Sequence, residues 1–241
     1  MNNKSALLFI HAQTSLHPGS GTSTGAIDLP VQRERHTDWP LIPGSTVKGV
    51  LRDYCRLKEI ENREISGDTE GDNKKSCFQK ADEVAALECV FGPSQKSNRA
   101  DEHAGALAVT DARILLFPVR SLCGLFAWVT CPAVLDRLRR DAKFLTDMPM
   151  LVPEIPLGND KDAFVSLSDA LLVKNPFEGS NMVLEEFDFK ASKQEGNGLQ
   201  TFAKTIAEKL DLKRLETHLA VISDDMFTYF VKNATEVNPK S

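Results

Sequence analysis

A glycine-rich loop near the N-terminus holds the first residues that could carry chemistry. It runs from His17 to Asp28 and contains Gly19, Gly21 and Gly25. Glycines let a backbone approach a ligand closely and direct successive N–H groups at an anion, but no Gly-Lys-Ser/Thr follows in the frame of a P-loop. A carboxylate such as Asp28 can bind a metal ion or take a proton from a hydroxyl, with His17 as an acid–base partner. A plain connecting loop with a turn-forming aspartate explains the same residues.

A second group of residues suits phosphate binding. Lys48, Arg52 and Arg56 are spaced by four residues and therefore fall on one side of a helix. Ser45 can cap that helix, and the backbone N–H groups of its first turn, from Gly44 on, can bind a phosphate together with Lys48. An ordinary solvated helix edge explains this pattern equally well.

The elements that must position these residues indicate an α+β fold. Hydrophobic spacing predicts strands at 6–12, 107–117, 122–130, 163–173, 182–189 and 218–222, and helices that begin at Ser45 and Pro132 or cover 79–90, 200–214 and 224–234. We expect the helices on one face of the sheet. The strand 122–130 is nearly all apolar, which is typical of a strand covered on both faces. The polar run 61–76 predicts an irregular insertion.

Composition limits the class of protein. The chain has 241 residues, of which 41% are hydrophobic and 26% charged, so it can form one large domain or two small ones. Its net charge of −5 argues against a protein that coats nucleic acid with its whole surface. The segment 29–56 nevertheless holds five basic and three acidic residues, which is compatible with a local basic groove on an acidic body. Arg-Leu-Arg-Arg at 137–140 is a second basic cluster.

The cysteines and the hydropathy pattern exclude further classes. The five cysteines are irregularly spaced, and no Cys-x-x-Cys or His-Glu-x-x-His motif occurs, so neither a disulfide framework nor a zinc site is indicated. We expect buried thiols in a reducing compartment, above all at Cys123 and Cys131. No apolar run approaches the roughly 20 residues that cross a bilayer. We therefore expect a soluble, cytoplasmic protein without a membrane segment.

Several motifs resemble those of RAMP proteins, the repeat-associated proteins of CRISPR systems. The element Ile42-Pro-Gly-Ser-Thr-Val-Lys-Gly is similar to one that marks RAMP proteins generally. The runs Asp28-Leu-Pro-Val-Gln-Arg-Glu and Phe117-Pro-Val-Arg-Ser resemble the backbone subunit of type III-B (Cmr) effector complexes, and Ser223-Asp-Asp-Met-Phe is a further match. The matches occur in the same order as in that family and span most of the chain.

The resemblance implies a single domain with a modified ferredoxin-like (RRM-like) RAMP palm, inserted loops and a β-hairpin thumb. The palm would comprise 1–58, 105–146 and 200–241, the polar and helical insertion 59–104, and the thumb a part of 147–195. Members of this family continue past the last helix into a strand and a glycine-containing segment, whereas here no glycine follows Gly198. We therefore expect the C-terminal part of the family to be missing, and we expect activity from the assembled complex rather than from the isolated chain.

The resemblance also implies an activity and partners. Copies of such a subunit stack head to tail along a CRISPR RNA, with other Cmr subunits, and cut complementary single-stranded target RNA at regular intervals beside nucleotides that the thumb displaces. Asp28 matches the catalytic acid and His17 a supporting residue, with Mg²⁺ or Mn²⁺ as the expected cofactor and Asp28 as either its ligand or the base. Ser45, Lys48 and Arg52 match the element that binds guide phosphates, which Gly44 and Arg56 extend.

Three other functions fit the residues less completely. The first is a purely structural RNA-binding subunit of the same complex, in which Asp28 is inert. The second is a nuclease that processes CRISPR RNA, for which His17 and His36 would have to serve. The third is a small-molecule enzyme, which would not show the steep salt dependence of RNA binding.

Overall fold

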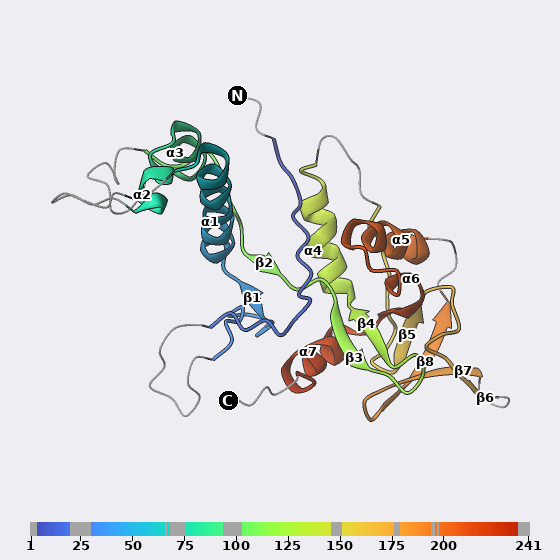
Figure 1. Ribbon diagram of the computed structural model, residues 1–241. Helices are drawn as coiled ribbons and strands as arrows, with labels where there is room; N and C mark the ends of the chain where they lie inside the picture. Colours follow the sequence, from blue (N-terminus) through green and yellow to red (C-terminus); the bar gives the residue numbers. More distant parts are fainter. Residues whose placement is uncertain are drawn as a thin grey trace. The chain divides into compact units, whose positions relative to one another are not determined.

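The chain forms two compact units. The computed structural model describes residues 4–19, 30–65, 67, 76–93, 103–145, 151–175, 179–193, 196 and 198–235. The first unit comprises Met1–Pro40 and Ile114–Ser241, and the second comprises Leu41–Arg113 (Figure 1). The predicted division into palm, insertion and thumb is a family-based assignment that these units do not test, and it stays a prediction.

A curled sheet forms the first unit. Among the described residues it has seven strands, which run across the sheet in the order β3, β4, β9, β5, β8, β7, β6. Their bounds are β3 Phe117–Arg120, β4 Phe126–Thr130, β5 Asp162–Val165, β6 Val173–Asn175, β7 Gly179–Leu184, β8 Phe187–Lys193 and β9 Leu219–Val221. Neighbouring strands are antiparallel except β4 with β9 and β5 with β8. Ser121, just after β3, forms a bridge to Leu184 of β7, so the sheet curls back toward its first strand.

Hydrophobic clusters occupy both faces of this sheet. Along β4, Ala127 and Val129 belong to one cluster, and Trp128 packs against the other. Helix α7 (Asp224–Asn233) contributes to the first cluster, α5 (Gly198–Leu210) to the second and α4 (Pro132–Ala142) to both. The expectation of helices on one face is therefore wrong, because side chains of alternate residues in β4, β5 and β9 are apolar on both sides. The expectation that the strand at 122–130 is covered on both faces is confirmed for its 126–130 part.

The remaining predictions for the first unit hold in part. The strand expected at 163–173 is two strands, β5 and β6, and the strand expected at 182–189 spans the turn between β7 and β8. The mixed α+β class is confirmed, and the helices expected at Pro132, 200–214 and 224–234 correspond to α4, α5 and α7. A one-turn helix, α6 (Leu215–His218), precedes β9 and was not predicted. The hairpins β6–β7 and β7–β8 lie within the range expected for the thumb, but their assignment as a thumb stays a prediction, as does the ferredoxin-like description of the palm.

The strand expected at 6–12 is absent from the described residues. Its side chains alternate in burial as those of a strand do, since Leu7 and Phe9 pack against the second cluster while Leu8 and Ile10 are exposed. The segment nevertheless makes no backbone hydrogen bond within the described part of the chain, so it is extended but not part of a sheet.

The second unit is mainly helical. It contains β1 (Leu41–Ile42), α1 (Gly44–Arg63), α2 (Cys77–Asp82), α3 (Ala85–Phe91) and β2 (Ala112–Arg113), and β1 pairs with β2 in antiparallel fashion. The helix expected at 79–90 is two helices, because the backbone of Val84 between them is extended. The strand expected at 107–117 is reduced to β2 and the beginning of β3. Most of the expected insertion 61–76 lies outside the described residues.

The chain returns from the insertion along the end of α3. The Ala106 and Leu107 N–H groups donate to the carbonyls of Cys89 and Val90, each at 2.9 Å. A Cβ on Gly105 would lie 2.3 Å from the carbonyl carbon of Phe91, so only glycine fits this approach. These contacts fix the backbone that leads from Gly105 toward β2.

Two sequence expectations concern burial and the membrane. Cys131 is buried as expected, but Cys123 is partly exposed, as are Cys55 and Cys77, and Cys89 is exposed. Burial raises the pKa of the Cys131 thiol. Within the described ranges, the helices are too short or too polar to cross a lipid bilayer.

Candidate functional site

The loop with the expected catalytic aspartate is described only at its two ends. Asp28 lies outside the described residues. Gly19 forms an antiparallel bridge with Val31, and the Gln32 N–H donates to the Pro18 carbonyl at 2.8 Å. The two ends of the loop are therefore held side by side, with the exposed His17 next to this stem.

The segment 31–40, which we call the arm, continues from this stem into a tight reversal. Arg33 forms an antiparallel bridge with Pro40, and the Glu34 N–H donates to the Trp39 carbonyl at 2.8 Å. Asp38 adopts a left-handed backbone conformation with φ of 62°, which aspartate tolerates better than most residues. The first residues of the arm, Val31 and Gln32, thus pair with the loop stem, and the rest of the arm pairs with itself across the reversal.

A buried ion pair ties the arm to α4. Arg137 donates one guanidinium N–H to each carboxylate oxygen of Glu34, both at 2.9 Å, and the two side chains are only 13% and 5% exposed. Burial alone would raise the pKa of Glu34, but hydrogen bonds from the Thr37 hydroxyl and from Arg137 outweigh it, so the pKa lies below its ordinary value. The carboxylate is therefore held ionised against α4.

Trp39 makes the second anchor of the arm. Its ring is buried beneath the Arg137 guanidinium, 4.7 Å from the ring centre, and packs edge-to-face on Phe227 of α7. Its indole N–H donates to the Thr228 hydroxyl at 2.9 Å. Arg137 therefore contacts both anchors, the Glu34 carboxylate and the Trp39 ring.

The start of α1 differs from the sequence prediction. The helix begins at Gly44, its N-cap is Pro43, and Ser45 is exposed without capping it, so the prediction of Ser45 as N-cap is wrong. The Gly44 N–H instead donates to Asp111 Oδ1 at 2.8 Å. A carboxylate from a distant part of the sequence takes the place that a serine hydroxyl was expected to fill, and it also suits the positive end of the helix dipole.

The basic residues of α1 are bound to other groups of the second unit. Lys48 Nζ donates to the Leu107 carbonyl at 2.9 Å. Arg52 and Arg56 both bind Asp82 of α2, with Nε–Oδ1 distances of 3.0 and 2.7 Å, and the Asp82 side chain is 7% exposed. Burial opposes the charge of Arg56, but its bonds to Asp82 and Asp53 outweigh this and raise its pKa. RNA binding by these residues is not tested by their contacts and stays a prediction.

The structure brings only some of the expected site residues together. Arg52 and Arg56 meet at Asp82, whereas His17 belongs to the first unit and the basic residues of α1 to the second. Sequence reasoning missed Glu34, Asp82 and Asp111 as partners. Glu34 lies 103 residues from Arg137, and Asp111 lies 67 residues from Gly44. No local spacing in the sequence could have indicated such pairs.

The cluster at 137–140 is partly structural. Arg137 binds Glu34 and Leu138 is buried. Arg139 binds Asp136 at 2.7 Å and donates to the Pro153 carbonyl at 2.9 Å. Arg140 is exposed and lines a shallow hollow on α4. The expected basic cluster therefore presents one exposed arginine.

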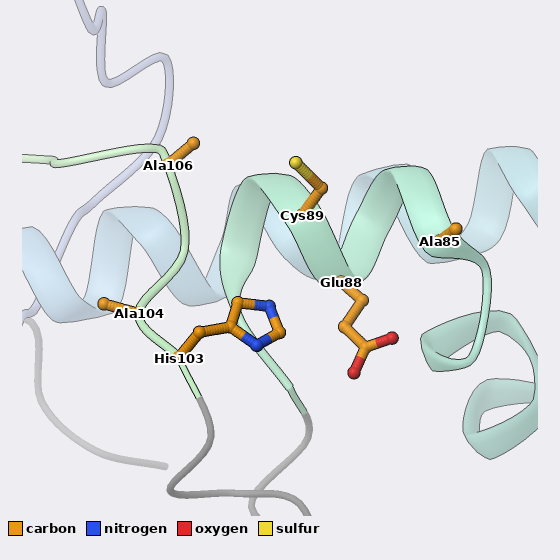
Figure 2. Close-up of a pocket in the computed structure, with 6 residues that line it drawn as sticks. All are labelled: Ala85, Glu88, Cys89, His103, Ala104 and Ala106. Carbon is orange, nitrogen blue, oxygen red and sulfur yellow. The ribbon is translucent and has the colours of Figure 1, made fainter.

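A hollow of about 310 Å³ lies between α3 and the segment after His103 (Figure 2). Its lining is mostly apolar, with alanines beside Glu88, Cys89 and His103. In Figure 2 the Cys89 thiol points away from the imidazole of His103, so the two do not form a nucleophile and base. Across the described ranges, no three His, Cys, Asp or Glu residues are grouped so that they could hold a metal ion.

Comparison with known proteins relates this chain to one family. The sequence matches the RAMP superfamily over residues 9–240. It is 35% identical to the CRISPR system Cmr endoribonuclease Cmr4 of Pyrococcus furiosus over 238 residues, which cover 97% of this chain and 70% of that protein.

Solved structures give the same relationship. The oligomeric Cmr4 of Pyrococcus furiosus superposes with a TM-score of 0.65 at 32% identity, covering 92% of this chain and 69% of that one. A chain of a type III-B Cmr-beta complex bound to cognate target RNA has a TM-score of 0.57 at 16% identity, covers 90% of this chain and 65% of that one, and shows the shared fold alone. The chain therefore belongs to the RAMP superfamily and, within it, to the family of the Cmr4 proteins.

Proposed function

We propose that this protein is the backbone subunit of a type III-B CRISPR complex, that it binds CRISPR RNA, and that it cleaves complementary target RNA at regular intervals. The observation that carries this proposal is the 35% identity to a Cmr4 endoribonuclease across 97% of the chain. In such a complex the guide reads the target by base pairing, while the protein holds the RNA backbone.

Asp28 and His17 are the proposed catalytic residues. Asp28 takes the proton of a target 2′-hydroxyl, and the 2′-oxygen attacks the adjacent phosphorus as the bond from phosphorus to the 5′-oxygen breaks. His17 supplies the proton to the leaving 5′-oxygen, which gives a 2′,3′-cyclic phosphate and a 5′-hydroxyl. In-line attack requires a nucleotide displaced from the stack, at a cost of a few kcal/mol. The pairing of Gly19 with Val31 supports this assignment, because it closes the loop beside His17.

Gly44, Ser45, Lys48, Arg52 and Arg56 are the proposed guide contacts. Ser45 is exposed and free to approach a phosphate, whereas Lys48 is partly buried. Arg52 and Arg56 can reach a phosphate only while they share their charge with Asp82. Lys48 instead donates to the neutral Leu107 carbonyl and keeps its charge, so we expect Ser45 and Lys48 to contribute most of the binding at this helix.

A divalent cation, Mg²⁺ or Mn²⁺, belongs to the same proposal. The described residues do not supply a protein cage for it, and we derive no step through it. Mg²⁺ often binds one or two carboxylates together with substrate phosphates. If Asp28 serves as the metal ligand instead of the base, it would be the single ligand from this chain and RNA phosphate oxygens would complete the site.

The partners follow from the same relationship. The relative from Pyrococcus furiosus has been solved in an oligomeric form. Further copies of this chain, other Cmr subunits, CRISPR RNA and target RNA are the proposed partners. A head-to-tail contact that does not close would build a helical filament along the guide.

The test uses the complex reconstituted with guide RNA and a labelled complementary target, with Mg²⁺ or Mn²⁺. We expect regularly spaced fragments from the wild-type complex, and none from Asp28→Asn although it still binds the target. Asp160→Asn, in an exposed loop, is the matched control and should cleave normally. If the wild-type complex binds the target without cutting it, the chain is a structural RNA-binding subunit. If Asp28→Asn cuts normally, the catalytic assignment is wrong.

A further inference from the structure

The buried pair of Glu34 and Arg137 has a geometry that points beyond stability. We propose that Glu34 and Arg137 are positioning residues for target-RNA cleavage, which hold the stem of the loop that bears Asp28, and His17 beside it, in register with α4 and α7. The inference rests on the proposed function, and it concerns residues that do not themselves touch RNA.

The contacts form a continuous path from the ion pair to the stem. Glu34 is fixed on α4 by two hydrogen bonds at 2.9 Å. Two residues before Glu34, Gln32 donates to the Pro18 carbonyl, and Val31 pairs with Gly19. Only Gln32 and Arg33 separate Val31 from Glu34, so we expect a shift of Glu34 to reach the stem. Pro18 directly follows His17, so the same shift moves the imidazole.

The second anchor makes this path rigid. Trp39 is held by the Arg137 guanidinium above its ring and by Thr228 at its indole N–H. The Trp39 carbonyl accepts the Glu34 N–H, which joins the two anchors through the backbone. Arg33 adds a hydrogen bond of 2.8 Å to the Asp38 carbonyl. Because Arg137 touches both anchors, one side chain of α4 contributes to holding each of them.

The choice of an ion pair at this place is itself informative. A buried ion pair stabilises a fold no better than apolar side chains of similar volume, because removing both charges from water is costly. What it adds is direction, since a guanidinium and a carboxylate with two parallel hydrogen bonds fit in one orientation. An apolar contact would hold the arm against α4 but would leave it free to slide. A catalytic loop needs the first property and also the second.

The experiment compares cleavage with binding in the assembled complex. Arg137→Lys keeps the charge but loses the two-bond fork, and Thr37→Val removes the hydroxyl that binds Glu34. Single-turnover cleavage, target affinity and the thermal unfolding midpoint are measured for each variant. Arg139→Lys is the matched control, because Arg139 lies on the same helix and binds Asp136, away from the arm.

We expect Arg137→Lys to lower the cleavage rate constant about 10–100-fold, the scale of a displacement of about 1 Å at a reacting centre, with target affinity unchanged. Thr37→Val should give a smaller loss in the same direction, and it decides the question if Arg137→Lys is unfolded at the assay temperature. The Arg139→Lys control should cleave like the wild type.

The outcomes separate this inference from the function on which it rests. Suppose that the wild type cleaves, that Asp28→Asn does not, and that Arg137→Lys and Thr37→Val both cleave at the wild-type rate. The positioning role is then refuted and the proposed function stands. If affinity falls in parallel with cleavage, the pair supports RNA binding or folding in general, which also refutes the inference. If the wild-type complex does not cleave at all, both proposals fail.

Discussion

Gly44→Ala is the substitution for which the structure gives the sharpest expectation. A Cβ at this position would lie 2.4 Å from the Val109 carbonyl oxygen and 2.8 Å from the Thr110 carbonyl carbon. Both are backbone atoms of the segment that leads to β2, so neither can rotate away. The Gly44 N–H also donates to Asp111 in the same segment. The methyl group would therefore separate the start of α1 from the segment whose Asp111 carboxylate accepts the Gly44 N–H.

The size of the effect follows from two opposing terms. Overpacking of a close contact costs about 1–3 kcal/mol, and replacement of glycine by alanine in a helix returns about 0.5–1 kcal/mol. We expect Gly44→Ala to destabilise the second unit by roughly 1–2 kcal/mol. Gly49 is the matched control on the same helix, because a Cβ there meets no atom within 4 Å. Gly49→Ala should therefore stabilise the helix by about 0.5–1 kcal/mol.

Hydrogen–deuterium exchange of peptides from α1 is the appropriate assay. The two tryptophans, Trp39 and Trp128, both lie in the first unit, so tryptophan fluorescence does not report on α1. Exchange in α1 should be faster than wild type in Gly44→Ala and slower in Gly49→Ala. Wild-type exchange in Gly44→Ala would refute the close approach to the segment before β2. If Gly44→Ala showed wild-type exchange in α1 and yet bound guide RNA more weakly, Gly44 would act through RNA contact instead of packing.

Three further outcomes are expected. The pKa of Glu34 is lowered in the folded protein. The ionised carboxylate therefore stabilises the fold above about pH 4.3, the ordinary pKa of a glutamate, and this contribution is lost as the pH falls through the lowered pKa. The difference in urea stability between wild type and Glu34→Gln should shrink as the pH falls below about 4.3. Iodoacetamide should modify the exposed Cys89 in the native protein, whereas the buried Cys131, whose pKa burial raises, should react only on unfolding, as mass spectrometry of peptides can show. Asp82→Asn should steepen the dependence of guide-RNA affinity on salt, by about 0.7 in log–log slope for each additional phosphate contact, and an unchanged slope would mean that Arg52 and Arg56 contact no phosphate.

The sequence predicted the elements that have strong local signals. Pro132 correctly marks the first turn of α4, and the Ser223 side chain accepts a hydrogen bond from the Met226 N–H at the start of α7. Ser45 misled for a physical reason, because a serine side chain is only one source of an acceptor for a helix start. Here Asp111 supplies the acceptor from far along the chain. Capping by a distant residue leaves no trace at the helix itself.

The same limit applies to the candidate site. The spacing of Lys48, Arg52 and Arg56 correctly places them on one side of α1, but spacing cannot show that Asp82 of α2 binds the two arginines there. The extended segment with Leu7 and Phe9 shows the complementary case. The strand was predicted from the apolar run of the segment alone, whereas membership of a sheet depends on a partner strand that such a run does not specify.

The basic side of α1 is best understood as compensated by carboxylates. Asp111 occupies the N–H group of Gly44, where a phosphate was expected, and Asp82 holds the guanidinium groups of Arg52 and Arg56. Each carboxylate neutralises charge that RNA would otherwise meet, so this helix attracts a phosphate less than three free cations would. The partly buried charges of Arg52 and Arg56 are thus already paired without RNA. In the proposed function, a guide strand laid along this helix would meet a surface that is organised in advance, and the cost of ordering these arginines would not be subtracted from its binding free energy.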